Sequence, residues 1–219
     1  MYLSFTPRFL QSMFSELLWR VESQRPELFL TFDDGPIPEV SPWVLDQLDQ
    51  FDAKASFFCV GQNIERFPEI FDLIKAKGHT IGNHTYNHLS GWCTDNAAYF
   101  ENVRKGALVS GSNLFRPPYG RLKPSQTRFL KRHYQIVMWD VLSGDFDPNL
   151  SADACFTNVV KNTQPGSIIV FHDSLKSAKR LYEVLPRILE YYSLQGYQFK
   201  ALDSHSVLSY ADKEHYSFA

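Results

Sequence analysis

The sequence predicts a single-domain α/β fold with a parallel sheet, which could be wound open, although the chain length favours a compact barrel slightly smaller than the usual TIM barrel. Three observations support this prediction. The chain has 219 residues, of which 44% are hydrophobic, and this is enough to bury one sizeable core. Short apolar runs typical of strands alternate with longer stretches of helical periodicity. No internal repeat, low-complexity tract or linker is visible, so residues 1–219 are expected to form one domain.

The first predicted strand is the apolar run from Leu28 to Phe32, which ends at two carboxylates and a Gly-Pro turn. Six further strands are expected at residues 55–60, 79–81, 113–115, 135–139, 167–171 and 197–202. Helices are expected at residues 41–48, 68–74, 95–109, 124–133, 151–162 and 178–194, where Ser-Pro, Pro or Ser begins the pattern or Gly ends it. This alternation favours a parallel sheet with right-handed crossovers.

Residues 1–24 are expected to form a helical extension that packs on the barrel. Thr6 and Pro7 suit a helix start. Apolar side chains then recur with helical spacing on one stripe: Phe9, Leu10, Met13, Phe14, Leu17, Leu18 and Val21. The alternative is a helix in a membrane interface, although its polar face would carry more Lys and Arg. No segment is long enough to span a bilayer.

Charge and cysteine content narrow the choice of partners. The chain has 22 basic and 24 acidic residues, with no run of either sign, which excludes an obvious nucleic-acid surface. A neutral polymer or a small molecule is the expected partner. Cys59, Cys93 and Cys155 are isolated, so we expect buried thiols, not disulfides or a zinc knot.

Asp33 and Asp34 stand together at the carboxyl end of the first predicted strand. Side chains of neighbouring strand residues point in opposite directions, so the two acids can share one site only if the turn re-aims one of them. A division of labour follows, in which one carboxylate binds a cation and the other handles a proton. The alternative is that the two residues only open a turn.

His84 and His88 follow the third predicted strand and are four residues apart. Two such imidazoles can project from one helical turn toward the same divalent metal. Asp34 would supply a third ligand and leave a position open for water, which is typical of catalytic sites and not of structural zinc. Exposed histidines at this spacing also occur without any function.

Three more polar clusters lie at predicted strand ends, where parallel α/β folds build their sites. In Arg116-Pro117-Pro118-Tyr119 the prolines can fix the guanidinium of Arg116 and the N–H of Tyr119, which suits an oxyanion. A plain polyproline turn is the alternative. Residues 139–147 carry several acids, and residues 170–173 carry His172, which could equally be a buried polar group.

Together these clusters resemble the polysaccharide deacetylase family, also called the NodB-homology or carbohydrate esterase 4 family. The most specific matches are Thr31-Phe32-Asp33-Asp34-Gly35-Pro36, His84-Thr85-Tyr86-Asn87-His88 and Arg116-Pro117-Pro118-Tyr119. The resemblance implies a distorted TIM-like barrel of seven or eight β/α units. It also implies metal-dependent removal of acetyl groups from N-acetylglucosamine units of an oligo- or polysaccharide, such as peptidoglycan or a chitin-like polymer. It also implies that Asp34, His84 and His88 bind one divalent metal, with Zn²⁺ as first candidate and Co²⁺, Mn²⁺ or Ni²⁺ as alternatives.

The resemblance also implies catalytic roles. Asp33 would be the general base, and Arg116 would orient it. His172 would be the general acid, and Asp145 matches the acid that partners this histidine. Tyr119 would present its N–H to the oxyanion.

The chain departs from the family pattern at the fourth and fifth clusters. Phe146 stands where Trp is common, Leu142 where a second acid is frequent, and Val170 where Leu usually lines the acetyl pocket. Asp140 and Asp147 are close enough in sequence to compete for the partnership with the histidine. The shape of the acetyl pocket and the specificity of the groove therefore stay open.

Two rival functions remain at this point: a carbohydrate-binding relative that has lost turnover, and an amidase that acts on a small cyclic or ureido substrate. Location is open as well. The N-terminal apolar stretch is interrupted by Pro7 and Arg8, so no signal peptide is expected and a cytoplasmic location is favoured. Most members of the family nevertheless work outside the cytoplasm.

Overall fold

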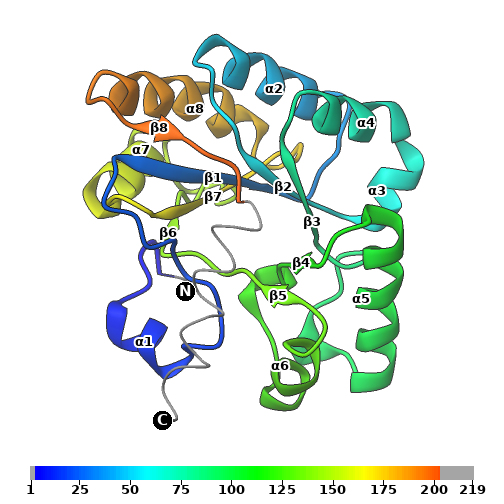
Figure 1. Ribbon diagram of the computed structural model, residues 1–219. Coiled ribbons are helices and arrows are strands. Elements are labelled where there is room, and N and C mark those ends of the chain that lie inside the picture. The colour runs from blue at the N-terminus through cyan, green and yellow to red at the C-terminus, as the bar shows by residue number, and fades with distance from the viewer. Residues whose placement is uncertain (1–2, 203–219) are drawn as a thin grey trace.

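One parallel sheet, curled into an open half-barrel with helices on its outside, forms the molecule (Figure 1). The computed structural model describes residues 3–202, so residues 1, 2 and 203–219 of the predicted domain lie outside the described part. The predicted α/β fold class is confirmed.

The strands are β1 (Glu27–Asp33), β2 (Ser56–Cys59), β3 (Thr80–Asn83), β4 (Leu114–Phe115), β5 (Gln135–Ile136), β6 (Val141–Leu142), β7 (Ile168–His172) and β8 (Gln198–Phe199). Their order in the sheet is β5-β4-β3-β2-β1-β7-β6, and β8 pairs with the start of β1. The seven predicted strands are present, but the fifth ends at Ile136, earlier than expected. Strand β6 was not predicted, because Val141 and Leu142 lie within the acid-rich segment 139–147 and belong to no longer apolar run.

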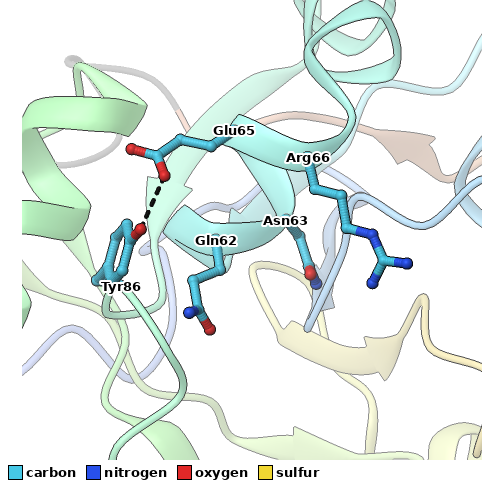
Figure 2. A pocket seen from close by; sticks show the side chains of 5 residues that line it. All are labelled: Gln62, Asn63, Glu65, Arg66 and Tyr86. Atoms are coloured by element: carbon cyan, nitrogen blue, oxygen red, sulfur yellow. Dashed lines mark hydrogen bonds between the residues drawn. The ribbon is translucent and has the colours of Figure 1, made fainter.

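The helices are α1 (Arg8–Met13), α2 (Ser41–Gln50), α3 (Gly61–Arg66), α4 (Pro68–Ala76), α5 (Asn96–Ser110), α6 (Pro124–Leu130), α7 (Ala152–Asn162) and α8 (Ala178–Ser193). Local chemistry explains several ends. The Asp95 side chain accepts a hydrogen bond from Ala98 N at the start of α5, and Gly111 ends that helix with a φ of 67°. Helix α3 is too short to be predicted from periodicity, and its side chains line a cleft (Figure 2).

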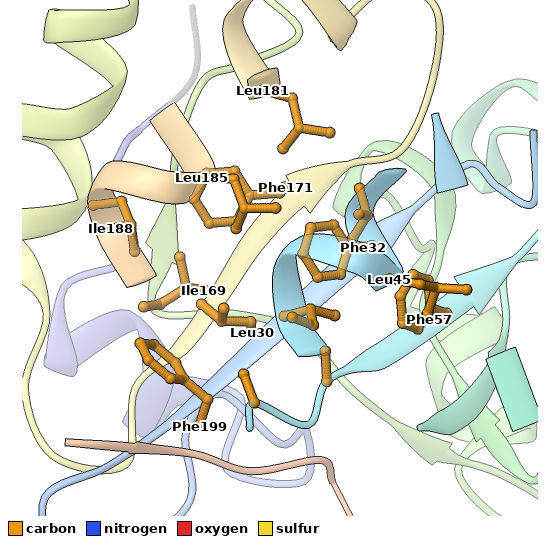
Figure 3. Packing of buried hydrophobic residues seen from close by; sticks show 14 of the residues in the cluster. Leu30, Phe32, Leu45, Phe57, Ile169, Phe171, Leu181, Leu185, Ile188 and Phe199 are labelled. Atoms are coloured by element: carbon orange, nitrogen blue, oxygen red, sulfur yellow. The ribbon is translucent and has the colours of Figure 1, made fainter. Parts of the chain in front are cut away.

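Strand β1 has two apolar faces. Leu28, Leu30 and Phe32 pack outward against α2 and α8 in the main core (Figure 3), whereas Phe29 packs in a second cluster inside the barrel. Burial of each large side chain contributes roughly 1.5–3 kcal/mol relative to exposure. Because side chains alternate along a strand, Asp33 shares the inward face with Phe29. The first carboxylate therefore points into the barrel.

The N-terminal segment lies along the open side of the half-barrel and pairs with the residues just after β5 and just before β7. The helix predicted to continue to Val21 ends at Met13, and none of its six residues is buried. Beyond it the chain is extended: Leu18 pairs in parallel with Val137, and Leu18 itself is fully buried among barrel-interior residues. The helical prediction past Met13 is wrong because these apolar residues serve a strand-like contact.

Two smaller expectations concern membranes and thiols. Among residues 3–202, no helix combines the length and apolar character that crossing a membrane would need. Cys59 and Cys155 are buried as predicted. Cys93 is exposed, so the prediction of a buried thiol is wrong there.

Candidate active site

Asp33 ends β1 inside the barrel, where it meets a buried arginine. Nη1 of Arg116 donates to Oδ1 of Asp33 at 2.7 Å and to Oγ1 of Thr31 at 2.7 Å. Thr31 and Asp33 share a face of the strand, so one guanidinium reaches both. Its other nitrogens donate to the carbonyls of Val137 and Met138, and Cζ lies 4.1 Å from the ring centroid of Phe58. The guanidinium is thereby fixed in one orientation.

Asp34 is re-aimed by the turn. Its φ of 84° is in the left-handed region, which directs the side chain away from its strand position. The carbonyl of Asp34 accepts a hydrogen bond of 2.7 Å from Nδ2 of Asn63. The turn therefore re-aims Asp34, as the sequence requires if Asp33 and Asp34 are to serve one site.

The buried carboxyl of Asp173, the residue directly after β7, holds this turn from the other side. Oδ1 of Asp173 accepts from Gly35 N at 2.9 Å, and Oδ2 accepts from Ser41 Oγ at 2.5 Å. Burial, reinforced by the charge of Asp34, raises the pKa of Asp173 to about 8. A Cβ at Gly35 would lie 2.0 Å from Oδ2 of Asp173, so only glycine fits at this point of the turn.

The two predicted histidines converge on Asp34. Nε2 of His88 lies 3.1 Å from Oδ1 of Asp34, and Nε2 of His84 lies 3.7 Å from the same oxygen. Their segment is a loop, so the prediction of a helical turn is wrong: Thr85 and His88 have φ values of 66° and 60°. Asn102 of α5 holds the loop by accepting from Tyr86 N at 3.0 Å.

The three side chains fit a divalent cation. Their donor atoms lie within 4.8 Å of one another, and Oδ1 of Asp34 is buried without a hydrogen-bond partner among the described residues. Burial lowers the pKa of His84 to about 4, so its imidazole is neutral at pH 7, as a ligand must be. Nδ1 of His84 lies 2.8 Å from the carbonyl oxygen of Arg116, so a proton on Nδ1 leaves Nε2 free to bind metal.

His172 lies next to Asp33 across the sheet, because the two residues are register partners in β7 and β1. Nδ1 of His172 is 2.8 Å from Oδ1 of Asp145, and Oδ2 of Asp145 accepts from His172 N at 2.8 Å. Burial alone would lower the pKa of His172, but Asp145 outweighs it and raises the pKa to about 9. The imidazole is therefore protonated near pH 7.

The competing acids of the fourth cluster are engaged elsewhere. Asp140 is tied to the start of β7, where it accepts from Ser167 Oγ at 2.8 Å and from Ile168 N at 2.9 Å. Oδ1 of Asp147 accepts from Asn149 N at 3.0 Å. The structure thus places Asp145, and neither of the other two, against the histidine.

A cavity of about 430 Å³ joins these groups at the carboxyl edge of the sheet. Its lining consists of Asp33, Asp34, His84, His88, Tyr119, Arg121, Trp139, Leu142, Phe146, Val170, His172 and Lys176. Tyr119 is exposed with a φ of 61°, and its ring centroid is 4.8 Å from that of His88. Leu142 and Val170, which differ from the family pattern, both face the cavity.

A second, polar cleft of about 450 Å³ lies over α3 (Figure 2). It is lined by Gln62, Asn63, Glu65, Arg66 and Tyr86. The hydroxyl of Tyr86 donates to Glu65 at 2.7 Å. Tyr86 belongs to the histidine loop and Asn63 holds the Asp34 turn, so this cleft adjoins the candidate metal site.

Sequence reasoning missed three residues of the site. Asp173 directly follows the histidine of β7, but its contact with the Asp34 turn depends on the three-dimensional pairing of β1 and β7. Arg121 and Lys176 carry no motif, and single exposed cations give no signal in a sequence. A search for charged residues two to four positions after each motif would have found both cations.

Comparisons with known proteins agree with this geometry. A family model described as polysaccharide deacetylase matches residues 20–136. A peptidoglycan-N-acetylglucosamine deacetylase of Bacillus cereus is 34% identical over 196 residues, which are 83% of this chain and 88% of that protein. A chitooligosaccharide deacetylase of Azorhizobium caulinodans is 30% identical over 163 residues, 70% of this chain and 77% of that protein.

The fold agrees as well. The crystal structure of a peptidoglycan N-acetylglucosamine deacetylase superposes with a TM-score of 0.81 and 32% identity, covering 90% of this chain and 95% of that one. The sequence match and the shared architecture cover both the metal-ligand cluster and the strands that carry it. The chain therefore belongs to the metal-dependent polysaccharide deacetylase family.

Proposed function

We propose that the protein is a metal-dependent hydrolase that removes acetyl groups from N-acetylglucosamine units of an oligo- or polysaccharide. The observation that carries this proposal is the convergence, in one cavity, of a three-residue ligand set with Asp33 and the charged His172. A base and an acid beside a cation site are the parts that amide hydrolysis requires. Relatives named as peptidoglycan and chitooligosaccharide deacetylases support the choice of substrate.

Asp34, His84 and His88 would hold the cation. Two imidazoles and one carboxylate favour Zn²⁺, with Co²⁺, Mn²⁺ and Ni²⁺ as alternatives. When bound, the cation supplies Lewis acidity, which eases deprotonation of the attacking water and polarises the acetyl carbonyl.

Asp33 acts as the general base in this scheme. Arg116 engages Oδ1 of its carboxylate, which leaves Oδ2 to accept the proton of the attacking water. The guanidinium and the carboxylate form a buried ion pair with an N–O distance of 2.7 Å. Because Arg116 is itself held by two backbone carbonyls, the base keeps one orientation.

Tyr119 stabilises the oxyanion in this scheme, and His172 protonates the departing amine. Water attack on the acetyl carbon produces an oxyanion, and the N–H of Tyr119, in its left-handed turn, is the proposed donor to it. The C–N bond then breaks, and the departing amine takes a proton from His172. The contact with Asp145 keeps that histidine protonated near pH 7.

The test is acetate release from an N-acetylglucosamine tetramer and from peptidoglycan fragments, before and after chelation and after metal is added back. We expect release only with metal present. Tight binding of the oligomer to metal-loaded protein without acetate release would favour the non-catalytic alternative. Release that survives complete removal of metal would favour the metal-independent amidase alternative.

A further inference from the structure

Two cations on the cavity wall have no part in the proposed chemistry. Arg121 and Lys176 both line the cavity and are exposed. Neither forms a salt bridge with any residue from 3 to 202. The acids of the cavity are engaged, since Asp33 is paired with Arg116 and Asp34 lies against two histidines.

Arg121 lies on the metal-ligand side of the cavity. Its Cζ is 5.1 Å from the ring centroid of Trp92 and 5.9 Å from that of Tyr119, which in turn contacts His88. Cation–π contacts of this kind hold a guanidinium in place and leave its edge N–H groups free to donate. The site therefore presents an oriented fork of donors beside the ligand set.

Lys176 lies on the general-acid side. Its Nζ is 5.6 Å from the ring centroid of Phe146, and this ring is 5.1 Å from that of His172. Arg180 ties the backbone together here, because it donates to the carbonyls of Asp145 and Lys176. Arg180 therefore links the backbone of Lys176 to that of Asp145, the partner of His172.

The local charge differs in sign from that of the whole chain. The protein has a net charge of −2, yet the two unpaired side chains at the cavity wall are both positive. Exposed cations beside a cleft attract ligands of the opposite charge and increase their association rate. A neutral chitin-like chain offers nothing to match these cations, whereas carboxylates do.

We propose that Arg121 and Lys176 make the site favour an acetylated glycan that carries carboxylates close to the reacting sugar over a neutral glycan of equal length. Peptidoglycan strands have this chemistry through lactyl ethers and stem peptides. This inference rests on the proposed deacetylase function and narrows its substrate class. Exposed charge contacts are individually weak, so we expect each cation to contribute about two- to fivefold in kcat/KM.

The experiment compares two tetramers of equal length in metal-loaded protein: an N-acetylglucosamine tetramer, and one that alternates N-acetylglucosamine with N-acetylmuramic acid. We expect kcat/KM about fivefold or more in favour of the carboxylated tetramer at low salt, and a smaller preference at high salt. Arg121→Gln and Lys176→Gln should each reduce kcat/KM on the carboxylated tetramer several-fold more than on the neutral one.

Two control variants separate charge from packing. Lys179→Gln removes an exposed positive charge on α8 that does not line the cavity, and it should leave the preference unchanged. Arg121→Lys keeps the charge and should retain most of the preference that Arg121→Gln loses. Equal losses on both tetramers in Arg121→Gln would overturn the inference, because they would indicate only a general packing role.

Calorimetric binding of both tetramers keeps the inference testable without turnover. If acetate is released from both substrates but neither rate nor affinity favours the carboxylated one, the substrate class is wrong and the deacetylase function stands. If no acetate is released, the proposed function fails, and tighter binding of the carboxylated tetramer still supports the charge selection. Equal affinity for the two tetramers, or no binding of either, overturns it.

Discussion

Oδ1 of Asp33 and Nη1 of Arg116 lie 2.7 Å apart inside the barrel, and the arginine has no exposed surface. Removing two charges from water is costly, and this cost is recovered only where every donor has a partner. Each of the three guanidinium nitrogens of Arg116 has at least one partner, because Thr31, Val137 and Met138 accept from it in addition to Asp33. The pair thus links the proposed base at the end of β1 to the residue directly after β4, across the sheet positions of β2 and β3.

Asp33→Asn should abolish turnover and keep the metal. The amide has the size of the carboxylate and can still accept from Arg116, but it cannot take a proton from water. We expect kcat to fall about 10²- to 10⁴-fold with unchanged metal content, measured by acetate release and elemental analysis. Full activity at full metal occupancy would reject the role of Asp33 as base; Asp34→Asn is the contrasting variant, which should lose metal.

Arg116→Met should destabilise the fold. It leaves the buried Asp33 carboxylate without its charge partner, so the free energy of unfolding should fall by about 3–5 kcal/mol. Denaturant titration with circular dichroism measures this change. Arg104→Met is the control, since Arg104 pairs with Glu101 on the exposed surface of α5 and its loss should give no measurable change. A similar effect for both variants would mean that the burial of the Asp33 pair is not decisive.

The His172–Asp145 pair should set an alkaline limit to activity. The pKa of His172 is raised from 6.5 to about 9, so the proton required for the leaving amine is lost as pH rises through that value. Because the folded-state pKa is above the unfolded one, the pair's contribution to stability is full below pH 6.5 and disappears as pH rises through about 9.

The matching variant is Asp145→Asn, which removes the main cause of the raised pKa and leaves burial to lower it. The alkaline limb of kcat/KM should then move to lower pH, and the imidazole NMR titration should move with it. An unchanged alkaline limb would show that some other group sets it.

Asp173→Ala should weaken metal binding although Asp173 is not a proposed ligand. The substitution removes both acceptors that hold Gly35 and Ser41, and with them the anchor of the turn that carries Asp34. Loss of such supporting contacts typically costs about 10- to 100-fold in metal affinity. Calorimetric titration with Zn²⁺ measures it. Ser41→Ala removes one of the two contacts and should have a smaller effect; an equal affinity in wild type and Asp173→Ala would exclude the anchoring role.

The sequence predicted those parts of the site that lie at or near the carboxyl ends of predicted strands. Asp33 ends β1, Asp34 and His84 directly follow β1 and β3, and His88 lies in the same loop as His84. Their convergence therefore follows from the common edge of a parallel sheet. The choice of Asp145 among three nearby acids could not be made, because spacing does not give side-chain direction. The three-dimensional contacts make the choice: Asp145 contacts Nδ1 of His172, whereas Asp140 contacts Ser167 and Asp147 contacts Asn149.

In the fold, too, local features could be predicted and long-range pairings could not. Apolar runs and Pro, Ser or Gly at the ends predicted most strands and helices, because these signals are local. The spacing of the apolar residues after Met13 predicts a helix, whereas the structure has an extended segment there. Their real partner, the carbonyl of Ile136, is far downstream, and no local pattern reports such a pairing.

The extended stretch around Leu18 has a consequence for the order of assembly. It precedes every strand of the sheet in the chain, yet its partners Val137 and Ser167 lie far downstream, after β5 and directly before β7. During translation the apolar side chains of this segment have no packing partners until the later strands have been synthesised. Closure should therefore be a late, slow and long-range step, and the interval before it is when a chaperone would be most needed.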